Sequence, residues 1–244
     1  MLRTKTIADE ESDDMRRIKK VQSLCRGWLY RRRWKRIVKE YIESPQAVNL
    51  RKRNRIVFEL VEKEGEYLSQ LEILVSNFLR PFKMAASSTK PPVTHEEINC
   101  IFLNSEILLF LHQIFYKGLV KKLDNWPTLF VGDIFDFLLP VLVVYQEYVR
   151  NHHYSLQILT ELKSKSPDFR ALLKRYEEKP KCEGRTLDVW LTYPMHQIPR
   201  YILLLHQLIT YTSQHSTNEL KCLENAKSKL EELSKVKNIS SSSS

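Results

Sequence analysis

The binding chemistry of this sequence is concentrated in one basic segment near its start. Residues 16–55 hold fifteen lysines and arginines against two glutamates, a net charge of +13, while the whole chain of 244 residues carries +10. From Met15 to Ile42 the cations alternate with apolar residues that recur at intervals of three or four. These residues are Ile18, Val21, Leu24, Cys25, Trp28, Leu29, Trp34, Ile37, Val38 and Tyr41. The pattern predicts a basic amphipathic helix, which suits an anionic membrane, nucleic acid or an acidic protein.

The spacing inside this segment favours an acidic protein. The segment resembles the IQ motif, (I/L/V)QxxxRGxxxR, at Val21, Gln22, Arg26, Gly27 and Arg31, with Trp28 after the glycine. The resemblance implies that Val21 enters the apolar groove of one calmodulin lobe, while Gln22 and Arg26 hydrogen-bond its rim. Gly27 then lets the second lobe approach closely, and Arg31 meets its acidic surface. The positive charge of the segment is complementary to calmodulin and would speed association.

Alternatives to calmodulin stay open for the basic helix. It could dock on an anionic membrane, or it could be a solvated linker packed on the next domain. Nucleic acid is the weaker candidate, because no recognisable base-reading fold accompanies the basic residues. We therefore expect calmodulin as the partner, an anionic membrane surface as the alternative, and no nucleic acid.

Residue types that carry covalent or metal chemistry show no comparable spacing. The sequence has four cysteines: Cys25, Cys100, Cys182 and Cys222. They form no CxxC pair and have no histidine pair nearby, which argues against a zinc site and a disulfide framework and indicates a reduced, cytoplasmic location. We expect no metal and no cofactor. We interpret His152 and His153 as surface or partly hydrogen-bonded groups.

No stretch predicts a signal peptide or a membrane span. Residues 1–14, MLRTKTIADEESDD, lack an apolar signal core. The most apolar run, residues 129–144, is interrupted by Asp133, Asp136 and Pro140 and falls short of a bilayer-spanning length.

Residues 187–208, LDVWLTYPMHQIPRYILLLHQL, form the most informative apolar pattern. The apolar positions three or four apart are Leu187, Trp190, Leu191, Ile198, Tyr201, Leu204, Leu205 and Leu208. Pro194 and Pro199 lie inside the pattern, and a proline in a helix interior costs about 3 kcal/mol. Either two helices meet at an irregular join, or one helix bends and directs its side chains at a partner.

The rest of the chain predicts long helices joined by short loops. Few glycines are present, and prolines fall mostly between apolar stretches. One helix is predicted from Ser44-Pro45 to Arg80-Pro81. The next begins at a capping box, Thr94 with Glu97, and runs through Leu123.

Further helices are predicted after the turn at Asn125. Residues 130–150 are apolar almost all round and predict a central buried helix with a kink at Pro140. Shorter helices are predicted over residues 154–163 and from Ser166-Pro167 to about residue 178. A capping box at Ser216 and Glu219 predicts a last helix that ends near residue 236.

These elements predict an all-α fold: an elongated bundle of about six long helices preceded by the basic helix. We divide the chain into an acidic, disordered start (1–14), the basic helix (15–43), the helical bundle (48–238) and a disordered serine tail (239–244).

Two motifs of the bundle resemble the Dbl homology domain. Residues 59–68, ELVEKEGEYL, are similar to its first conserved region, ELxxTExxYVxxL, and Glu64 falls on the glutamate of that region. Residues 187–208 are similar to its third conserved region, LxxPVQRIxKYPLLLxxL. The resemblance covers residues 55–238. With the IQ motif before it and the run TYPMHQIPRYIL at 192–203, the chain resembles the IQ and Dbl homology portion of the Ras guanine-nucleotide-releasing factors.

The resemblance implies nucleotide exchange on a Rho-family, Rac-like small GTPase. No covalent bond is made or broken, so the chain is expected to regulate a GTPase and not to be an enzyme itself. An exchange factor of this kind binds the nucleotide-free GTPase more tightly than the loaded one and so lowers the barrier to GDP release. It does so by remodelling switch I, switch II and the Mg²⁺ site. The GTPase partner would be met in the cytoplasm or at the inner face of the plasma membrane.

The family's functional residues map onto single positions of this chain. The resemblance assigns the contact with switch I to Glu64 and the contact with switch II to Arg200, which stands where lysine is usual. Counting along the pattern AxxxLxxLxxxxN from Ala226 assigns the asparagine of the last helix to Asn238.

Three positions in 187–208 depart from the family's pattern. Gln197 replaces the usual arginine, His196 the usual glutamine and Pro199 a threonine. We include His196 and Gln197 in the predicted GTPase-contacting set. The departures keep an alternative open: a non-catalytic calmodulin-binding helical scaffold, or a truncated regulatory fragment whose exchange activity needs missing domains.

Overall fold

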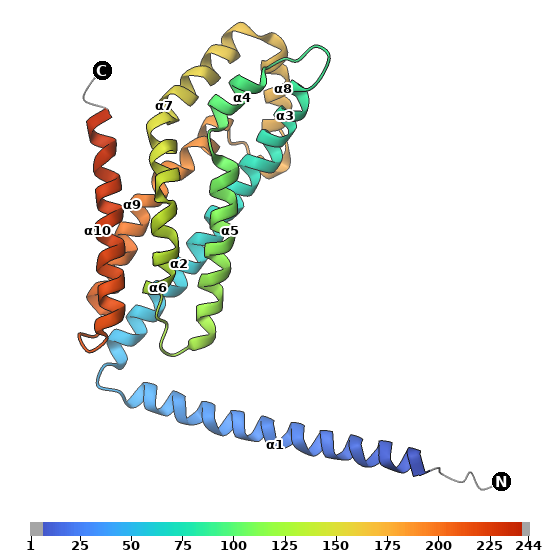
Figure 1. Cartoon of the computed structure of the whole chain (residues 1–244), viewed down its shortest axis with the longest axis vertical. Helices are drawn as coiled ribbons and strands as arrows, with labels where there is room; N and C mark the ends of the chain where they lie inside the picture. The colour runs from blue at the N-terminus through green and yellow to red at the C-terminus, as the bar shows by residue number, and fades with distance from the viewer. Residues whose placement is uncertain (1–6, 241–244) are drawn as a thin grey trace, which may run out of the picture. The chain divides into compact units, whose positions relative to one another are not determined.

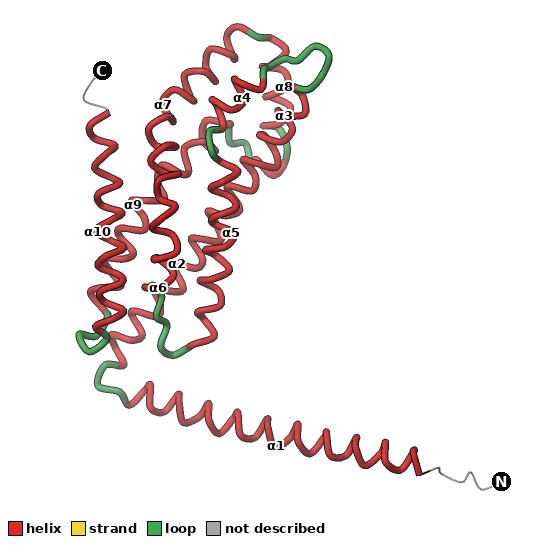
Figure 2. The backbone as a smooth tube through the Cα atoms, viewed as in Figure 1, coloured by secondary structure: helices red, strands yellow, loops and turns green. Residues whose placement is uncertain are grey.

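In a computed structural model the backbone of residues 7–240 and the side chains of 14–140 and 143–235 are described. All regular structure in this part of the chain is helical (Figures 1 and 2), so the predicted all-α fold is confirmed. Internal contacts divide the chain into two units, Met1–Val48 and Asn49–Ser244. The first unit consists mainly of helix α1, and the second is a helical bundle.

Helix α1 spans Ile7–Glu43 without interruption. The predicted disorder over 1–14 is therefore wrong for residues 7–14, while residues 1–6 lie outside the described part. The sequence explains the longer helix: 7–14 contain neither proline nor glycine, and five acidic residues lie near the helix N-terminus, where the macrodipole favours negative charge.

The apolar residues of α1 form two faces instead of the single predicted stripe. At 3.6 residues per turn, Ile18, Val21, Cys25 and Trp28 share one side, whereas Trp34 and Val38 point to the opposite side. Val21, Leu24, Trp28 and Leu29 are all more than half exposed, at 58%, 62%, 53% and 57%. The first half of α1 therefore presents an uncovered apolar surface among its cations.

The bundle begins with one long helical run made of three parts: α2 (Ala47–Ile73), the π-helix η1 (Leu74–Leu79) and α3 (Arg80–Ala86). The prediction that this helix ends at Arg80-Pro81 is wrong. In η1 the Arg80 N–H bonds the Val75 carbonyl, five residues back. This wider turn accommodates a proline that lacks an N–H and would clash with an ordinary turn.

The capping box that opens α4 (His95–Phe102) forms as predicted. The Glu97 N–H donates to Thr94 Oγ1 at 3.2 Å, and the Thr94 N–H donates to Glu97 Oε2 at 2.8 Å. A break at Leu103 and Asn104 separates α4 from α5 (Ser105–Lys122), which ends in the short 3₁₀ turn η2 (Leu123–Asn125).

The predicted central helix over 130–150 is not one helix. It consists of α6 (Gly132–Leu138), a 3₁₀ turn η3 (Leu139–Val141) at Pro140, and the start of α7 (Leu142–Lys165). Pro140 interrupts the α-helical ladder as its missing N–H requires, and the kink becomes a break. Helix α7 then continues through 154–163, which we predicted as a separate helix.

Two short elements lead to the last pair of long helices. Helix α8 (Pro167–Glu177) is capped as predicted, since Ser166 Oγ accepts from the Phe169 N–H at 3.1 Å; the 3₁₀ turn η4 (Pro180–Cys182) follows. Helix α9 (Leu187–Tyr211) is one continuous helix that contains both Pro194 and Pro199. Helix α10 (Thr217–Ser240) packs along α9, α7 and α6. By its backbone it extends beyond the predicted end near residue 236 into the predicted serine tail.

A single apolar core runs through the bundle and contains large side chains from every long helix of this unit. In Figure 1, α5, α7 and α10 run side by side, with α2 and α9 behind them. Helix α9 buries its face with Leu187, Trp190, Ile198 and Leu205, and this packing offsets the cost of its two prolines. Among the described helices none alone has the length and apolar character of a membrane span, although the bent pair His95–Phe102 and Ser105–Asn125 passes that test together.

Candidate functional site

Helix α9 has an exposed face near its middle. His196 and Pro199 are exposed, Arg200 is partly exposed, and the apolar Leu203 is 58% exposed. They lie three or four residues apart and so share one side of the helix. This side therefore offers a cation and apolar side chains to a partner.

The buried side of α9 contributes to a polar cluster around Glu64. The Glu64 side chain is fully buried, and Oε1 lies 2.5 Å from His112 Nδ1 on α5. Glu64 Oε2 accepts from the Tyr201 hydroxyl at 2.5 Å and from Gln197 Nε2 at 3.1 Å. A carboxylate only accepts, so His112 donates to it through Nδ1.

The cluster continues beyond His112 toward α7 and α2. The Tyr145 hydroxyl lies 2.6 Å from His112 Nε2 and 2.9 Å from the Tyr67 hydroxyl. The Tyr145 hydroxyl can donate one of these hydrogen bonds while it accepts the other. We call Glu64, Tyr67, His112, Tyr145, Gln197 and Tyr201 the Glu64 cluster. It joins α2, α5, α7 and α9, and every member is buried.

Burial keeps the tyrosine hydroxyls of this cluster protonated. It raises the pKa of Tyr67, Tyr145 and Tyr201 well above the ordinary value of 10.0. The negative charge of Glu64 is the next cause for Tyr201 and raises its pKa further. The tyrosines therefore act as permanent hydrogen-bond donors near neutral pH.

One branch of the Glu64 cluster reaches the surface. Gln197 donates to Glu64 through Nε2, and its Oε1 accepts from Arg200 NH1 at 3.3 Å. Arg200 is partly exposed and belongs to the exposed face of α9. The positive charge of Arg200 also acts on Tyr67, where it is one of the smaller influences on the pKa and lowers it.

The predicted GTPase-contacting residues thus fall into two groups. Arg200 and His196 reach the surface, whereas Glu64 and Gln197 lie inside the bundle at 1% exposure each. A direct contact with a GTPase needs an exposed side chain, so Glu64 and Gln197 are not placed for one in this structure, and the roles of all these residues stay predictions. Asn238 belongs to α10 by its backbone, but its side chain lies outside the described residues.

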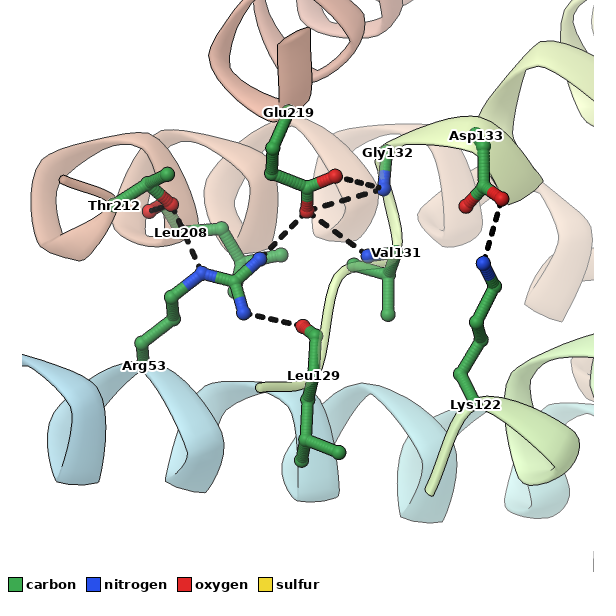
Figure 3. A network of polar contacts seen from close by, with 9 residues as sticks. All are labelled: Arg53, Lys122, Leu129, Val131, Gly132, Asp133, Leu208, Thr212 and Glu219. Atoms are coloured by element: carbon green, nitrogen blue, oxygen red, sulfur yellow. Dashed lines mark hydrogen bonds and ion pairs between the residues drawn. The ribbon is translucent and has the colours of Figure 1, made fainter. Parts of the chain in front are cut away.

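A second buried cluster lies elsewhere in the bundle, around Arg53 (Figure 3). Arg53 NH2 pairs with Glu219 Oε1 of α10 at 2.6 Å, Nε donates to Thr212 Oγ1 at 3.0 Å, and NH1 donates to the Leu129 carbonyl. Burial lowers the pKa of Arg53, and the charge of Glu219 acts against this shift. We call this set, with the Val131 and Gly132 amides, the Arg53 cluster.

Glu219 also caps the start of α6 in the Arg53 cluster. Its Oε1 accepts from the Val131 N–H at 2.9 Å, and its Oε2 accepts from the Gly132 N–H at 3.0 Å. The glycine is needed for this approach, because a Cβ at Gly132 would lie 2.7 Å from Cys222 Cβ and 2.8 Å from Glu219 Oε2. The predicted capping box of Ser216 and Glu219 gives way to these more distant contacts.

Sequence reasoning missed His112, Tyr145 and Arg53 as site residues. The available signal was a polar residue at a core position of an amphipathic helix. His112 lies four residues after Leu108 and three before Phe115, both of which are core residues. Such a position predicts a satisfied buried hydrogen-bonding group.

The residues of the predicted calmodulin site all lie on α1. Val21 and Trp28 are exposed on the same side of the helix, and Arg32 lies over the Trp28 ring at 5.3 Å. At Gly27 a Cβ would lie 3.3 Å from Arg31 NH1, so the guanidinium covers the glycine. Gln22 and Arg26 belong to the same exposed helix.

Comparison with known protein families identifies the bundle's sequence class. The RhoGEF domain model matches residues 56–238. The Ras-specific guanine nucleotide-releasing factor 1 of Mus musculus is 59% identical over 229 residues, which is 94% of this chain and 18% of that protein. Factor 2 of Rattus norvegicus is 59% identical over 231 residues, or 95% of this chain and 19% of that protein. The chain therefore spans about a fifth of the length of these relatives.

Solved structures show the same fold at lower sequence identity. The linker-DH/PH domains of p115-RhoGEF superpose with a TM-score of 0.69 at 21% identity and cover 79% of this chain and 57% of that one. The DH/PH fragment of PDZRHOGEF, solved in complex with human RhoA, gives 0.68 at 20% identity over 79% of this chain and 54% of that one. At such identities the likeness concerns the fold alone.

Proposed function

Because this chain belongs to the RhoGEF domain family, we propose that its bundle accelerates GDP release from a Rho-family, Rac-like small GTPase. The observation that carries this proposal is the exposed face of α9. It combines the partly exposed Arg200 with exposed His196, Pro199 and Leu203 on the helix that holds the family's third conserved region. A cation beside apolar side chains suits a partner surface that is both acidic and apolar.

The proposed mechanism is differential binding. A surface that fits the nucleotide-free GTPase better than the loaded form pulls the equilibrium toward GDP release without covalent chemistry. In this proposal Arg200 meets switch II, and the rearranged switches disturb the Mg²⁺ site. The carboxylate of Glu64 lies inside the bundle, so it acts through its neighbours or after a rearrangement.

Release of a fluorescent GDP analogue from Rac tests this proposal. The chain at micromolar concentration should accelerate release, and Arg200→Glu should abolish the acceleration. Arg175→Glu, the same charge reversal at an exposed position of α8, is the matched control and should leave the rate unchanged. No acceleration by the wild-type chain, with or without calmodulin, would contradict intrinsic exchange activity.

The choice of GTPase needs its own comparison. The relatives are named Ras-specific, but this chain spans only 18% of the length of one of them, and the RhoGEF domain model matches residues 56–238 of this chain. We therefore expect Rac to respond and Ras not to respond. An equal response of Ras in the same assay would overturn the Rho-family assignment.

We further propose that α1 binds calmodulin through its first half. Support comes from the exposed apolar side of Val21 and Trp28 and from the net charge of +13 over residues 16–55. In calorimetric titrations with and without Ca²⁺, Arg26→Glu should weaken calmodulin binding at least tenfold. Lys39→Glu, an equal charge change in the second half of α1, is the control.

A scaffold without exchange activity is the second candidate. The departures at His196, Gln197 and Pro199 favour it, because they alter the same helix that carries the exchange surface. Charge reversal at Glu64 cannot separate the two candidates, since a lysine in the buried cluster would disrupt the fold. Arg200→Glu separates the two candidates, because Arg200 lies at the surface. If the chain is a scaffold, the wild-type chain has no exchange activity, and the variant still binds calmodulin.

A further inference from the structure

We propose that Gln197 is a positioning residue. Its side-chain amide hydrogen-bonds both the buried Glu64 carboxylate and Arg200, and so holds the guanidinium on the exposed face of α9. We call this chain of two hydrogen bonds the relay. The two links are the contacts from Gln197 Nε2 to Glu64 at 3.1 Å and from Arg200 NH1 to Gln197 Oε1 at 3.3 Å. The relay itself is independent of any partner. Its consequence for exchange rests on the proposed function.

The chemistry of the two neighbours fixes the direction of the amide. A carboxylate only accepts hydrogen bonds, and a guanidinium only donates them. A group between them must therefore donate on one side and accept on the other, as the amide of Gln197 does. An arginine, the residue usual here in the family, could donate to Glu64 but would offer Arg200 no acceptor and would repel it.

The start of the relay is held rigidly. His112 and Tyr201 also donate to the Glu64 carboxylate, each at 2.5 Å, and all three side chains are buried. Four helices contribute to this cluster, so the carboxylate cannot follow a moving Arg200. The amide of Gln197, itself 1% exposed, transmits that fixed position outward.

The end of the relay is the only member that reaches solvent. Arg200 is partly exposed, whereas all six side chains of the Glu64 cluster are buried. An unrestrained arginine loses much rotamer freedom when a partner fixes it. An arginine already held by one hydrogen bond loses less, so we expect the relay to improve exchange efficiency about two- to tenfold.

Two substitutions at Gln197 distinguish the relay from the alternative that Gln197 is a weakened substitute for the family's arginine. Gln197→Met removes both hydrogen bonds at similar volume, and exchange efficiency should fall about two- to tenfold. Gln197→Arg restores the family's residue and keeps a donor for Glu64. The relay predicts that it lowers exchange as well, with the fold retained. If exchange rises with Gln197→Arg, then Gln197 is a weakened substitute for the arginine and the proposal is wrong.

A double-substitution cycle identifies Arg200 as the end of the relay. Gln197→Met should lower exchange much less in an Arg200→Ala background than in the wild-type chain. Equal losses in both backgrounds would mean that Gln197 acts on the fold or on the GTPase directly. Gln113→Met, the same change on α5, is the matched control, and urea denaturation confirms that each variant is folded.

A measurement on the free protein keeps the relay testable if the exchange activity itself fails. NMR of the Arg200 guanidinium reports rotation about its Nε–Cζ bond. Slow rotation is expected in the wild-type chain and faster rotation in Gln197→Met, with no change in Gln113→Met. Fast rotation in the wild-type chain would overturn the relay, whereas absent exchange with slow rotation would overturn only the proposed function.

Discussion

Two buried polar clusters hold this bundle together, and they differ in where their hydrogen bonds end. In the Arg53 cluster each nitrogen of the guanidinium donates to a buried acceptor, and Glu219 also accepts from the Val131 and Gly132 amides. In the Glu64 cluster the branch through Gln197 ends at the partly exposed Arg200. A closed cluster stabilises the fold, while an open one also connects the core to a surface.

The comparison predicts that the same substitution has different consequences in the two clusters. Both contain a buried glutamate, and both glutamates can be changed to glutamine with little change of shape. Loss of stability alone is the expected sign of the closed cluster. Loss of exchange per folded molecule is the additional sign of the open one.

Glu219→Gln should give the largest loss of stability. It removes the negative charge that compensates the buried Arg53 and weakens the cap of α6. Breaking one partner of a buried ion pair costs about 3–5 kcal/mol. Urea denaturation measures the change in the free energy of unfolding. Exchange per folded molecule should stay at the wild-type value, and a selective loss of exchange would connect the Arg53 cluster to the GTPase surface.

Glu64→Gln should lower the free energy of unfolding less than Glu219→Gln does, but it should also slow exchange. Either His112, which donates to Oε1, or both Tyr201 and Gln197, which donate to Oε2, must then face an NH₂ group, at about 1–3 kcal/mol. The relay through Gln197 loses its fixed start, so exchange per folded molecule should fall as well. Stopped-flow GDP release, corrected for the folded fraction by circular dichroism, measures this. An unchanged corrected rate would make the two clusters equivalent.

The tyrosines distinguish the two clusters by pH. Burial raises the pKa of Tyr67, Tyr145 and Tyr201 in the folded chain above the ordinary 10.0. Their contribution to stability is therefore fully present below pH 10 and is lost as the pH rises from there toward the folded pKa values. We expect the free energy of unfolding to fall above pH 10.

Tyr145→Phe should flatten that alkaline decline. It also removes the hydroxyl between His112 and Tyr67, at about 1–2 kcal/mol below pH 10. Glu219→Gln is the control, because it lowers stability without removing a tyrosine and should leave the slope above pH 10 unchanged. An equal slope in Tyr145→Phe and the wild-type chain would contradict the role of Tyr145.

Local signals in the sequence predicted local structure well. The capping box of Thr94 and Glu97 forms because both partners lie within one helical turn. The capping box of Ser216 and Glu219 has the same spacing but does not hold Glu219, which pairs with Arg53, 166 residues away. Arg53 outcompetes the local partner because it is a buried cation, and no local pattern reveals such a contact.

The prolines also show that a local pattern alone does not determine the structure. Pro81 was predicted to end a helix, but the wider turn of η1 carries the helix through it; Pro140 was predicted to kink a helix and breaks it. Pro194 and Pro199 interrupt nothing, since the buried face of α9 outweighs their cost. A proline predicts a local disturbance, while the surrounding packing decides whether the helix ends, bends or continues.

The sequence predicted which helices carry the candidate site, but not how deeply Glu64 and Gln197 are buried. The motifs selected Glu64 and residues 196–200, and the structure brings Glu64 into contact with Gln197 from a distant part of the chain. Their burial was also readable: Glu64 lies between the core residues Leu60 and Tyr67 at helical spacing, and Gln197 lies three residues after the buried Pro194. The motifs assign a functional role to Glu64 and Gln197 and say nothing about their burial, whereas the apolar period of their helices predicts that both are buried.

The smallest expected effect comes from Glu66, the exposed carboxylate two residues after Glu64. Its side chain is 48% exposed and pairs with Lys63 at 2.9 Å on the same helix, so Glu66→Gln should change stability by about 0–1 kcal/mol. Exchange should be unchanged, because Glu66 touches neither cluster. The measurement is the same GDP release assay, run beside Glu64→Gln.

This pair of variants decides how the first conserved region acts. Both substitutions remove one negative charge from the same turn of α2, one at the surface and one in the core. If Glu66→Gln slows exchange and Glu64→Gln does not, the carboxylate that meets the GTPase is the exposed one, and the Glu64 cluster is structural like the Arg53 cluster. If only Glu64→Gln slows exchange, a carboxylate enclosed by His112, Tyr201 and Gln197 controls a surface that it does not itself reach.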